Sequence, residues 1–121
     1  MPMIIYGIKN CDTMQKALKY LDAKNIKYVF HNYKMEGLDE KTLEYWFNYL
    51  PLAKIINTKS STYKKLSDQE KVAVLNKSEA MKLIIANTSM IKRPLFEFGE
   101  GKFLVGFNLD EWDLALNGFE S

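Results

Sequence analysis

The spacing of apolar residues divides the first third of the chain into a strand, a helix and a second strand. Residues 3–6 are an apolar run that stops at Gly7, which is typical of a buried parallel strand. From Asn10 the apolar residues recur at helical spacing, and residues 28–33 then combine β-forming Tyr, Val and Phe. Together these elements have the length of a right-handed βαβ crossover.

The middle of the chain is predicted to be helical, because several helix starts carry capping residues. Asp39 is placed to cap one helix, and Ser67 with Glu70 has the spacing of a capping box. Asn76 or Ser78 begins a further helix. The apolar stripes of these helices indicate core packing and not a ligand site.

The last third of the chain is predicted to form a hairpin and a helix. Two apolar runs, residues 95–98 and 102–105, flank a Gly-Glu-Gly turn, and Asn108 with Glu111 is spaced to cap the helix that follows. The order β-α-β, helical insert, β-β-α predicts an α/β fold with a mixed four-stranded sheet. We expect one domain over residues 1–121.

Composition and charge exclude several function classes. The net charge of +2 is too small for a protein whose main task is to neutralise a nucleic-acid backbone. No apolar run approaches the 18 or more residues that span a bilayer, and the N-terminus has no basic leader. We therefore expect a cytoplasmic monomer with no nucleic-acid and no membrane partner.

The chain has one cysteine, Cys11, and one histidine, His31, so an internal disulfide and a four-ligand zinc site are excluded. We expect no metal and no bound cofactor. A lone thiol is either a small buried hydrophobe or a reactive nucleophile. His31 near the end of the second strand is either a structural residue or a proton shuttle.

The position of Cys11 favours the nucleophile. It lies just beyond the first strand, at the opening of the first helix, where unpaired amides and the helix dipole stabilise an anion. Asp12 opposes ionisation through its like charge, whereas Lys9 and Lys16 would assist it. The Thr13 hydroxyl is placed to hydrogen-bond the sulfur or a bound anion.

A second candidate feature is the Arg93-Pro94 pair at the start of the hairpin. Of seventeen cationic residues Arg93 is the only arginine, which suggests a place where a planar, multi-donor group is needed. Proline is tolerated at the start of a strand because its missing N–H need not join the ladder.

Four segments together resemble the arsenate reductase (ArsC) family, which also holds the Spx regulators and the YffB-type proteins. They are residues 6–14, 56–66, 91–94 and 105–108, and the resemblance extends from about residue 3 to residue 112. The Gly-Ile-Lys-x-Cys-Asp-Thr-Met start is that of the YffB-type group, with Asn10 at the variable place.

The resemblance implies a thioredoxin-like fold with a helical insertion. Its core would comprise residues 1–37 and 88–121, and the insert residues 38–87. It also implies that Cys11 is the nucleophile, that Pro94 is a cis-proline facing the cysteine, and that Arg93 stabilises a thiolate or an oxyanion.

The chain departs from the family pattern at three places. Asn57, and Gly106 or Phe107, stand where arsenate reductases of the family carry further arginines, and Lys59 supplies charge without the fork geometry. Met14 stands where Spx-type proteins carry the second cysteine of a Cys-x-x-Cys motif, so no disulfide can form within the site.

These residues predict a thiol-dependent oxidoreductase that forms a mixed disulfide, which glutathione or another small thiol resolves. The substrate would be an oxidised protein or a small oxyanion. The catalytic residues are Cys11 and Arg93; the substrate-binding residues are Lys9, Asn10, Asp12, Thr13, Lys59, Lys92 and Pro94.

The alternative is a non-catalytic, Spx-like regulator that binds RNA polymerase or another protein, since a fold does not determine function. The absent second cysteine and the end of the chain at Ser121, where Spx-type proteins continue, favour the reductase.

Overall fold

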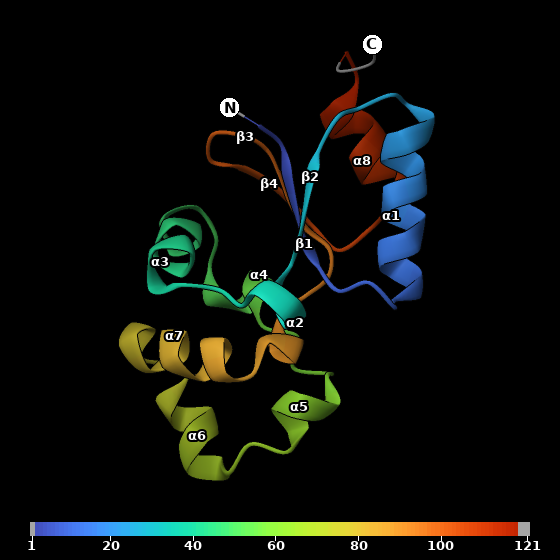
Figure 1. The fold of residues 1–121 in the computed structure, drawn as a ribbon. Helices are drawn as coiled ribbons and strands as arrows, with labels where there is room; N and C mark the ends of the chain where they lie inside the picture. Colours follow the sequence, from blue (N-terminus) through green and yellow to red (C-terminus); the bar gives the residue numbers. More distant parts are fainter. Residues whose placement is uncertain (1, 119–121) are drawn as a thin grey trace. The chain divides into compact units, whose positions relative to one another are not determined.

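A computed structural model describes residues 2–118, and the contacts between residues divide the chain into two compact units (Figure 1). The sheet unit comprises residues 1–32 and 93–121, and the helical unit comprises residues 33–92. Met1 and residues 119–121, the ends of the predicted domain, lie outside the described residues.

The sheet unit contains the predicted mixed four-stranded sheet. Its strands are β1 (Ile4–Gly7), β2 (Val29–Asn32), β3 (Leu95–Gly99) and β4 (Lys102–Val105). The strand order is β2-β1-β3-β4; β1 runs parallel to β2 and antiparallel to β3, and β3 runs antiparallel to β4. The parallel pair is the predicted βαβ crossover, and the antiparallel pair is the predicted hairpin.

Helices α1 (Asp12–Ala23) and α8 (Leu109–Leu116) belong to the same unit, and their apolar residues share one core with the sheet. Trp112 on α8 stacks on Phe96 of β3 with ring centroids 5.2 Å apart, and Phe107 packs edge-on against Trp112 at 5.0 Å. The fully buried members of this core are Ile5, Met14, Ala17, Leu21, Phe96 and Trp112. The core joins residues that are distant in sequence.

The helical unit consists of short helices. They are α2 (Tyr33–Glu36), α3 (Glu40–Tyr49), α4 (Leu52–Ile55), α5 (Ser61–Lys64), α6 (Asp68–Ala73), α7 (Lys77–Ala86) and the 3₁₀ helix η1 (Thr88–Met90). The predicted caps are confirmed at α3 and α6. The Thr42 N–H donates to Asp39 Oδ1 at 2.8 Å, and Ser67 and Glu70 exchange two hydrogen bonds of 3.1 and 2.9 Å.

Other predicted boundaries are now resolved. Asn76, and not Ser78, caps α7, because its side chain accepts from the Glu79 N–H at 3.1 Å. Asn108 caps α8 as predicted. Tyr33 was predicted at the end of a strand but begins α2, since β2 ends at Asn32. The four-residue helices α2, α4 and α5 were not predicted, because one helical turn is too short to show an apolar period.

Two separate segments of the helical unit are joined by a short antiparallel bridge between Ile56 and Ile91. The Asn57 N–H donates to the Met90 carbonyl at 2.7 Å, and the Lys92 N–H donates to the Ile55 carbonyl at 2.8 Å. Local caps therefore start several of the helices, and this bridge joins the middle of the unit to its C-terminal end.

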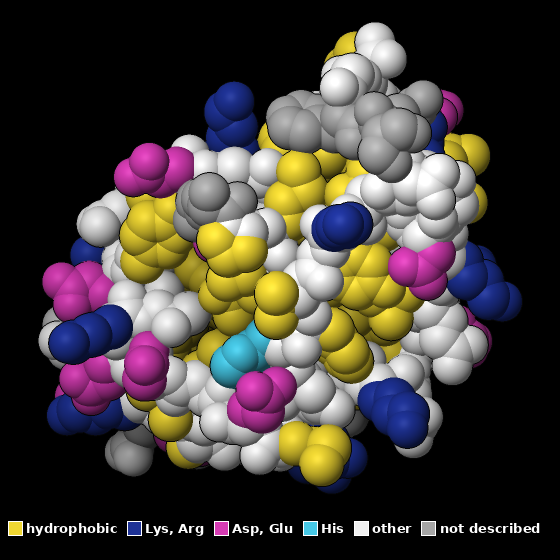
Figure 2. Space-filling view, turned by 45° about the horizontal axis from the view of Figure 1, so that its top comes forward, with side chains coloured by type: hydrophobic (Ala, Val, Ile, Leu, Met, Phe, Trp, Pro, Cys, Tyr) yellow, Lys and Arg dark blue, Asp and Glu magenta, His cyan; other side chains and the backbone are white. Residues whose placement is uncertain are grey.

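The described surface agrees with the small net charge. On the face in view in Figure 2, cationic side chains (dark blue) and acidic side chains (magenta) are interspersed. Within residues 2–118 no helix is both long and apolar enough to cross a bilayer.

Candidate active site

Cys11 is the N-cap residue of α1, four residues after the end of β1. Its backbone is extended, with φ −147° and ψ 126°, and its carbonyl accepts from the Gln15 N–H at 2.9 Å, which begins the helix. The side chain is half-buried and packs against the edge of the core of the sheet unit. The thiol therefore reaches solvent from a fixed backbone position.

The loop before Cys11 is held by a close contact between Gly7 and Met14. A Cβ atom at Gly7 would overlap the Met14 thioether, and Met14 is fully buried. The residue that stands in place of a second cysteine is thus a core residue under the loop. The site has a single thiol, as predicted.

The pKa of the Cys11 thiol lies below its ordinary value. Partial burial is the largest single influence and raises the pKa, but the Met14 amide, a hydrogen bond from Arg93, the Thr13 amide and the Arg93 charge together lower it by more. The side chain makes no cap hydrogen bond of the kind that oxygen caps make. The amides act on the sulfur because a thiolate is a stronger acceptor than a thiol, so they favour the ionised form.

The Arg93-Pro94 peptide bond is cis, as the resemblance implied. Pro94 is buried at the start of β3, and its carbonyl accepts from the Gly106 N–H at 2.7 Å. Gly106 has a φ of +73°, which favours glycine, and its carbonyl accepts from Trp112 Nε1 at 2.9 Å. These bonds attach the Arg93-Pro94 pair to the core of the sheet unit.

The other predicted residues near Cys11, in the preceding loop and the first turn of α1, differ in their exposure. Lys9, Asn10 and Asp12 are exposed, and Thr13 is half-buried. Among the described residues, the groups that shift the thiol pKa do not include Lys9, Asp12 or Lys16, whose opposing effects the sequence suggested. Thr13 acts through its backbone amide; the sequence had suggested its hydroxyl.

Two of the residues predicted to bind substrate, Lys59 and Lys92, belong to the helical unit, whereas Cys11 and Arg93 belong to the sheet unit. Lys92 Nζ donates to the Ala53 carbonyl at 2.8 Å. The Lys59 N–H donates to Asn57 Oδ1 at 3.0 Å, which closes a small turn. These contacts of Lys92 and Lys59 are both made to other residues of the helical unit.

His31 lies on β2 opposite Tyr6 of β1, and the two rings are 5.2 Å apart. This cross-strand contact supports the structural interpretation of the histidine. Sequence reasoning missed the Gly7–Met14 contact, for which the only signal was a glycine at the end of a strand followed by an apolar helix face.

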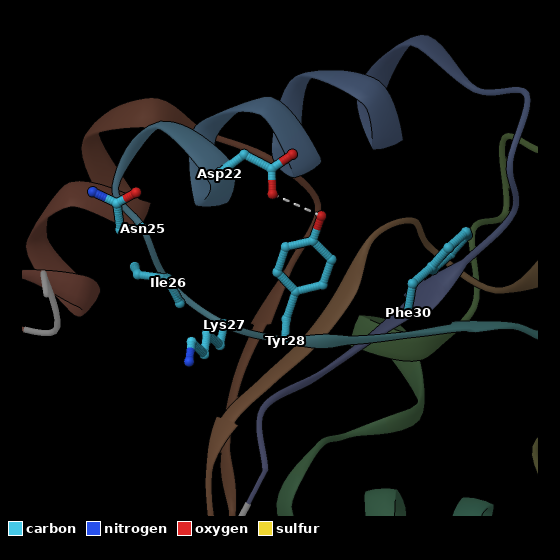
Figure 3. Close-up of a pocket in the computed structure, with 6 residues that line it drawn as sticks. All are labelled: Asp22, Asn25, Ile26, Lys27, Tyr28 and Phe30. Carbon is cyan, nitrogen blue, oxygen red and sulfur yellow. Dashed lines mark hydrogen bonds between the residues drawn. The ribbon is translucent and has the colours of Figure 1, made fainter.

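The hollow drawn in Figure 3 does not include the thiol. It has a volume of about 860 Å³ and lies at the end of α1 opposite to Cys11, where the Tyr28 hydroxyl donates to Asp22 Oδ1 at 3.0 Å. Burial and the Asp22 carboxylate raise the pKa of Tyr28. This hollow and the Cys11 thiol are therefore separate features of the sheet unit.

A mixed β2-β1-β3-β4 sheet, a cysteine at the N-terminus of its first helix and a cis-proline just before β3 define a thioredoxin-like fold. The chain belongs to the ArsC family, whose model matches residues 6–115.

Two curated relatives and two solved structures are similar over most of the chain. An uncharacterised protein of Haemophilus influenzae is 39% identical, with 92% of this chain and 96% of the relative covered. The global transcriptional regulator Spx of Streptococcus pneumoniae is 30% identical, with 84% and 76% covered.

The structure of a protein named YFFB has a TM-score of 0.85 and 41% identity, with 94% of this chain and 98% of that chain covered. An arsenate reductase (ArsC) related protein from Brucella melitensis has a TM-score of 0.74 and 39% identity, with 97% and 96% covered. The predicted thioredoxin-like ArsC fold is confirmed.

Proposed function

We propose that the protein is a thiol-dependent oxidoreductase in which Cys11 is the nucleophile and glutathione is the reductant. Within the ArsC family we place it with the YffB-type proteins, on the basis of its Cys-Asp-Thr-Met segment. The observation that carries the proposal is a half-exposed thiol whose pKa is lowered beside Arg93.

The reaction has two exchange steps. The Cys11 thiolate attacks one sulfur of a substrate disulfide, a new S–S bond forms to Cys11, and the second sulfur leaves as a thiolate. A glutathione thiolate then attacks this mixed disulfide and releases the Cys11 thiolate. With a glutathionylated protein as the substrate, the glutathione sulfur passes to Cys11 and the protein thiol leaves, and one further glutathione then releases Cys11 and forms glutathione disulfide. With a disulfide between two other thiols, the second step leaves a mixed disulfide of the substrate with glutathione, which a second glutathione reduces.

Met14 is the reason that the second thiol must come from outside. In a dithiol site a neighbouring cysteine resolves the mixed disulfide, but Met14 is buried against Gly7 and has no thiol. A soluble thiol is the remaining source of reducing electrons. Arg93 would pair with a carboxylate of glutathione or with an anionic substrate.

A disulfide substrate is favoured over arsenate. A divalent oxyanion is bound best by several planar cations, and Asn57, and Gly106 or Phe107, stand where the resemblance implies that arsenate reductases of the family carry further arginines. Arg93 alone supplies one such group. A comparison of turnover with a glutathionylated peptide and with arsenate, each in the presence of glutathione, distinguishes these substrates.

The first test is incubation with glutathione disulfide followed by intact-mass measurement. We expect an adduct of about 305 Da that reduced glutathione removes, because a monothiol site passes through this mixed disulfide. Cys11→Ser is the matched control and should stay unmodified. A wild-type protein that takes up no glutathione would remove the basis of the proposal.

The second test is the rate of iodoacetamide alkylation as a function of pH. Wild-type Cys11 should titrate below the ordinary thiol pKa of about 8.5. Arg93→Ala should raise the thiol pKa because it removes a hydrogen bond and a positive charge, and Arg93→Lys should lie between the two. Equal pKa values in all three proteins would exclude Arg93 from the site.

Similarity to Spx of Streptococcus pneumoniae supports a second candidate, a regulator that binds RNA polymerase. Its test is a binding assay with purified RNA polymerase. Binding that survives Cys11→Ser, in a protein that takes up no glutathione, would favour the regulator over the reductase.

A further inference from the structure

The helical unit carries an apolar groove formed by two adjoining hollows of about 230 and 240 Å³. Leu52 of α4 and Leu75, in the turn between α6 and α7, line both hollows, so we call this feature the Leu52–Leu75 groove. Phe47 completes the first hollow and Tyr63 the second. The groove uses no residue of the thiol centre.

The turn between α6 and α7 presents Leu75 to solvent. Val74 is 3% exposed and anchors the turn in the core, whereas Leu75 is 77% exposed and Val72 is also exposed. The Leu75 N–H donates to the Val72 carbonyl at 3.1 Å, which fixes the backbone of the turn. A single exposed leucine is ordinary, but one that lines two apolar hollows extends an accessible apolar surface.

Lysines lie over the aromatic ring of each hollow. Lys77 Nζ is 5.8 Å from the centre of the Phe47 ring, and Lys71 Nζ is 5.5 Å from the centre of the Tyr63 ring. Residues 51–77 contain six lysines and two acidic residues, hence a charge of +4, although the whole chain carries only +2. The groove is therefore apolar within a cationic surrounding.

We propose that the Leu52–Leu75 groove binds an acidic segment of a partner protein. Two apolar side chains of that segment would enter the two hollows, and its carboxylates would face Lys71 and Lys77. Charge complementarity selects this occupant: it steers the encounter, while burial of the apolar side chains supplies affinity. A second copy of this chain would bring the same lysines against one another, and a nucleic-acid backbone would leave the apolar hollows unfilled.

The test is selection of cysteine-free random peptides on the full chain, so that exchange at Cys11 contributes nothing. Counter-selection uses Leu75→Glu, which alters an exposed side chain and should fold normally. We expect the enriched peptides to carry at least two apolar residues and a net negative charge. Fluorescence anisotropy of one such peptide should show binding that weakens with salt and is about tenfold weaker in Leu75→Glu.

Matched variants make the test specific. Leu114→Glu changes a leucine that is 84% exposed on α8 of the sheet unit and should leave peptide affinity unchanged. Lys71→Glu with Lys77→Glu should weaken binding without altering the hollows.

Several results would overturn the proposal. They are enrichment of neutral or basic peptides, no enrichment over the Leu75→Glu counter-selection, and equal affinity for the wild type and Leu75→Glu. A dimer in sedimentation that Leu75→Glu abolishes would assign the groove to a second copy. Co-sedimentation with anionic phosphatidylserine vesicles, lost in Leu75→Glu, would assign it to a lipid surface.

Discussion

Helix α1 of the sheet unit begins in a different way from four helices of the helical unit. In the helical unit, α3, α5, α6 and α7 each start at an oxygen-bearing side chain that accepts from the amide three residues on. In the sheet unit, α8 starts in this way at Asn108, but α1 starts at Cys11, which makes no such bond. Sulfur replaces the common oxygen cap where the chemistry is proposed.

The amides at a helix start therefore have one of two roles in this chain: they stabilise the helix through an oxygen cap, or they lower the pKa of a thiol. An oxygen cap satisfies amides at the helix start, whereas at α1 the amides of Thr13 and Met14 act on the Cys11 sulfur and lower its pKa. The sheet unit can carry this weaker cap because its order comes from long-range contacts, notably those of Trp112 and Phe96.

The largest effect is expected from Trp112→Ala. Trp112 is fully buried, stacks on Phe96 and donates to the Gly106 carbonyl, so its removal leaves a large cavity in the sheet unit. The free energy of unfolding, measured by urea denaturation, should fall by about 3–5 kcal/mol. The control on the same helix is Leu114→Ala, an exposed position where the change should stay within about 0.5 kcal/mol. Equal losses in the two variants would contradict the assigned core.

A smaller loss is expected from Gly7→Ala. The added methyl group would overlap the buried Met14 side chain, and overpacking of this kind costs about 1–3 kcal/mol. In a Met14→Ala background the same change should cost less, because the space is then empty. A cost that is the same in both backgrounds would show that Gly7 is required for another reason.

Much of the fold could be predicted because its signals are local. The capping box of Ser67 and Glu70 and the Gly-Glu-Gly turn each depend on a few neighbouring residues, and the structure contains both. Tyr33 was assigned wrongly because its β propensity outweighed the end of the strand pairing, which the sequence does not show. The choice between Asn76 and Ser78 stayed open because both residue types cap helices.

The position of the candidate site could be predicted from the sequence, but the direction of the pKa shift of its thiol could not. The helix-start position of Cys11 follows from the apolar pattern, and the cis bond before Pro94 was implied only by the family resemblance. The sign of the thiol pKa shift could not be predicted, because burial opposes the Arg93 and amide contributions and each depends on distance. The Gly7–Met14 contact likewise exists only in three dimensions.

Asn76→Ala and Ser78→Ala form a matched pair in the helical unit. The Asn76 side chain accepts from the Glu79 N–H, so its loss should reduce the free energy of unfolding by about 1 kcal/mol. Ser78 lies inside α7 and is exposed, so alanine should be neutral within about 0.5 kcal/mol. Urea denaturation distinguishes the two, and the reverse order of effects would place the start of α7 at Ser78.

The smallest effect, and the most direct comparison of the two kinds of helix start, is expected from Cys11→Ser. Below the folded-state pKa of Cys11 the thiol is protonated, and a serine hydroxyl is the better cap, so in that range the variant should be more stable by roughly 0.5 kcal/mol. Because the folded-state pKa of Cys11 is lowered, the unfolded wild-type chain binds more protons between that pKa and about 8.5. The free energy of unfolding of the wild type should therefore rise with pH through this window, and the advantage of serine should shrink. Below the folded-state pKa the thiolate contributes nothing to stability.

The measurement is the difference in unfolding free energy between the two proteins from pH 6 to 9.5. If this difference does not change with pH, folding does not favour the thiolate. In an Arg93→Ala background we expect the pH dependence of the difference to become weaker.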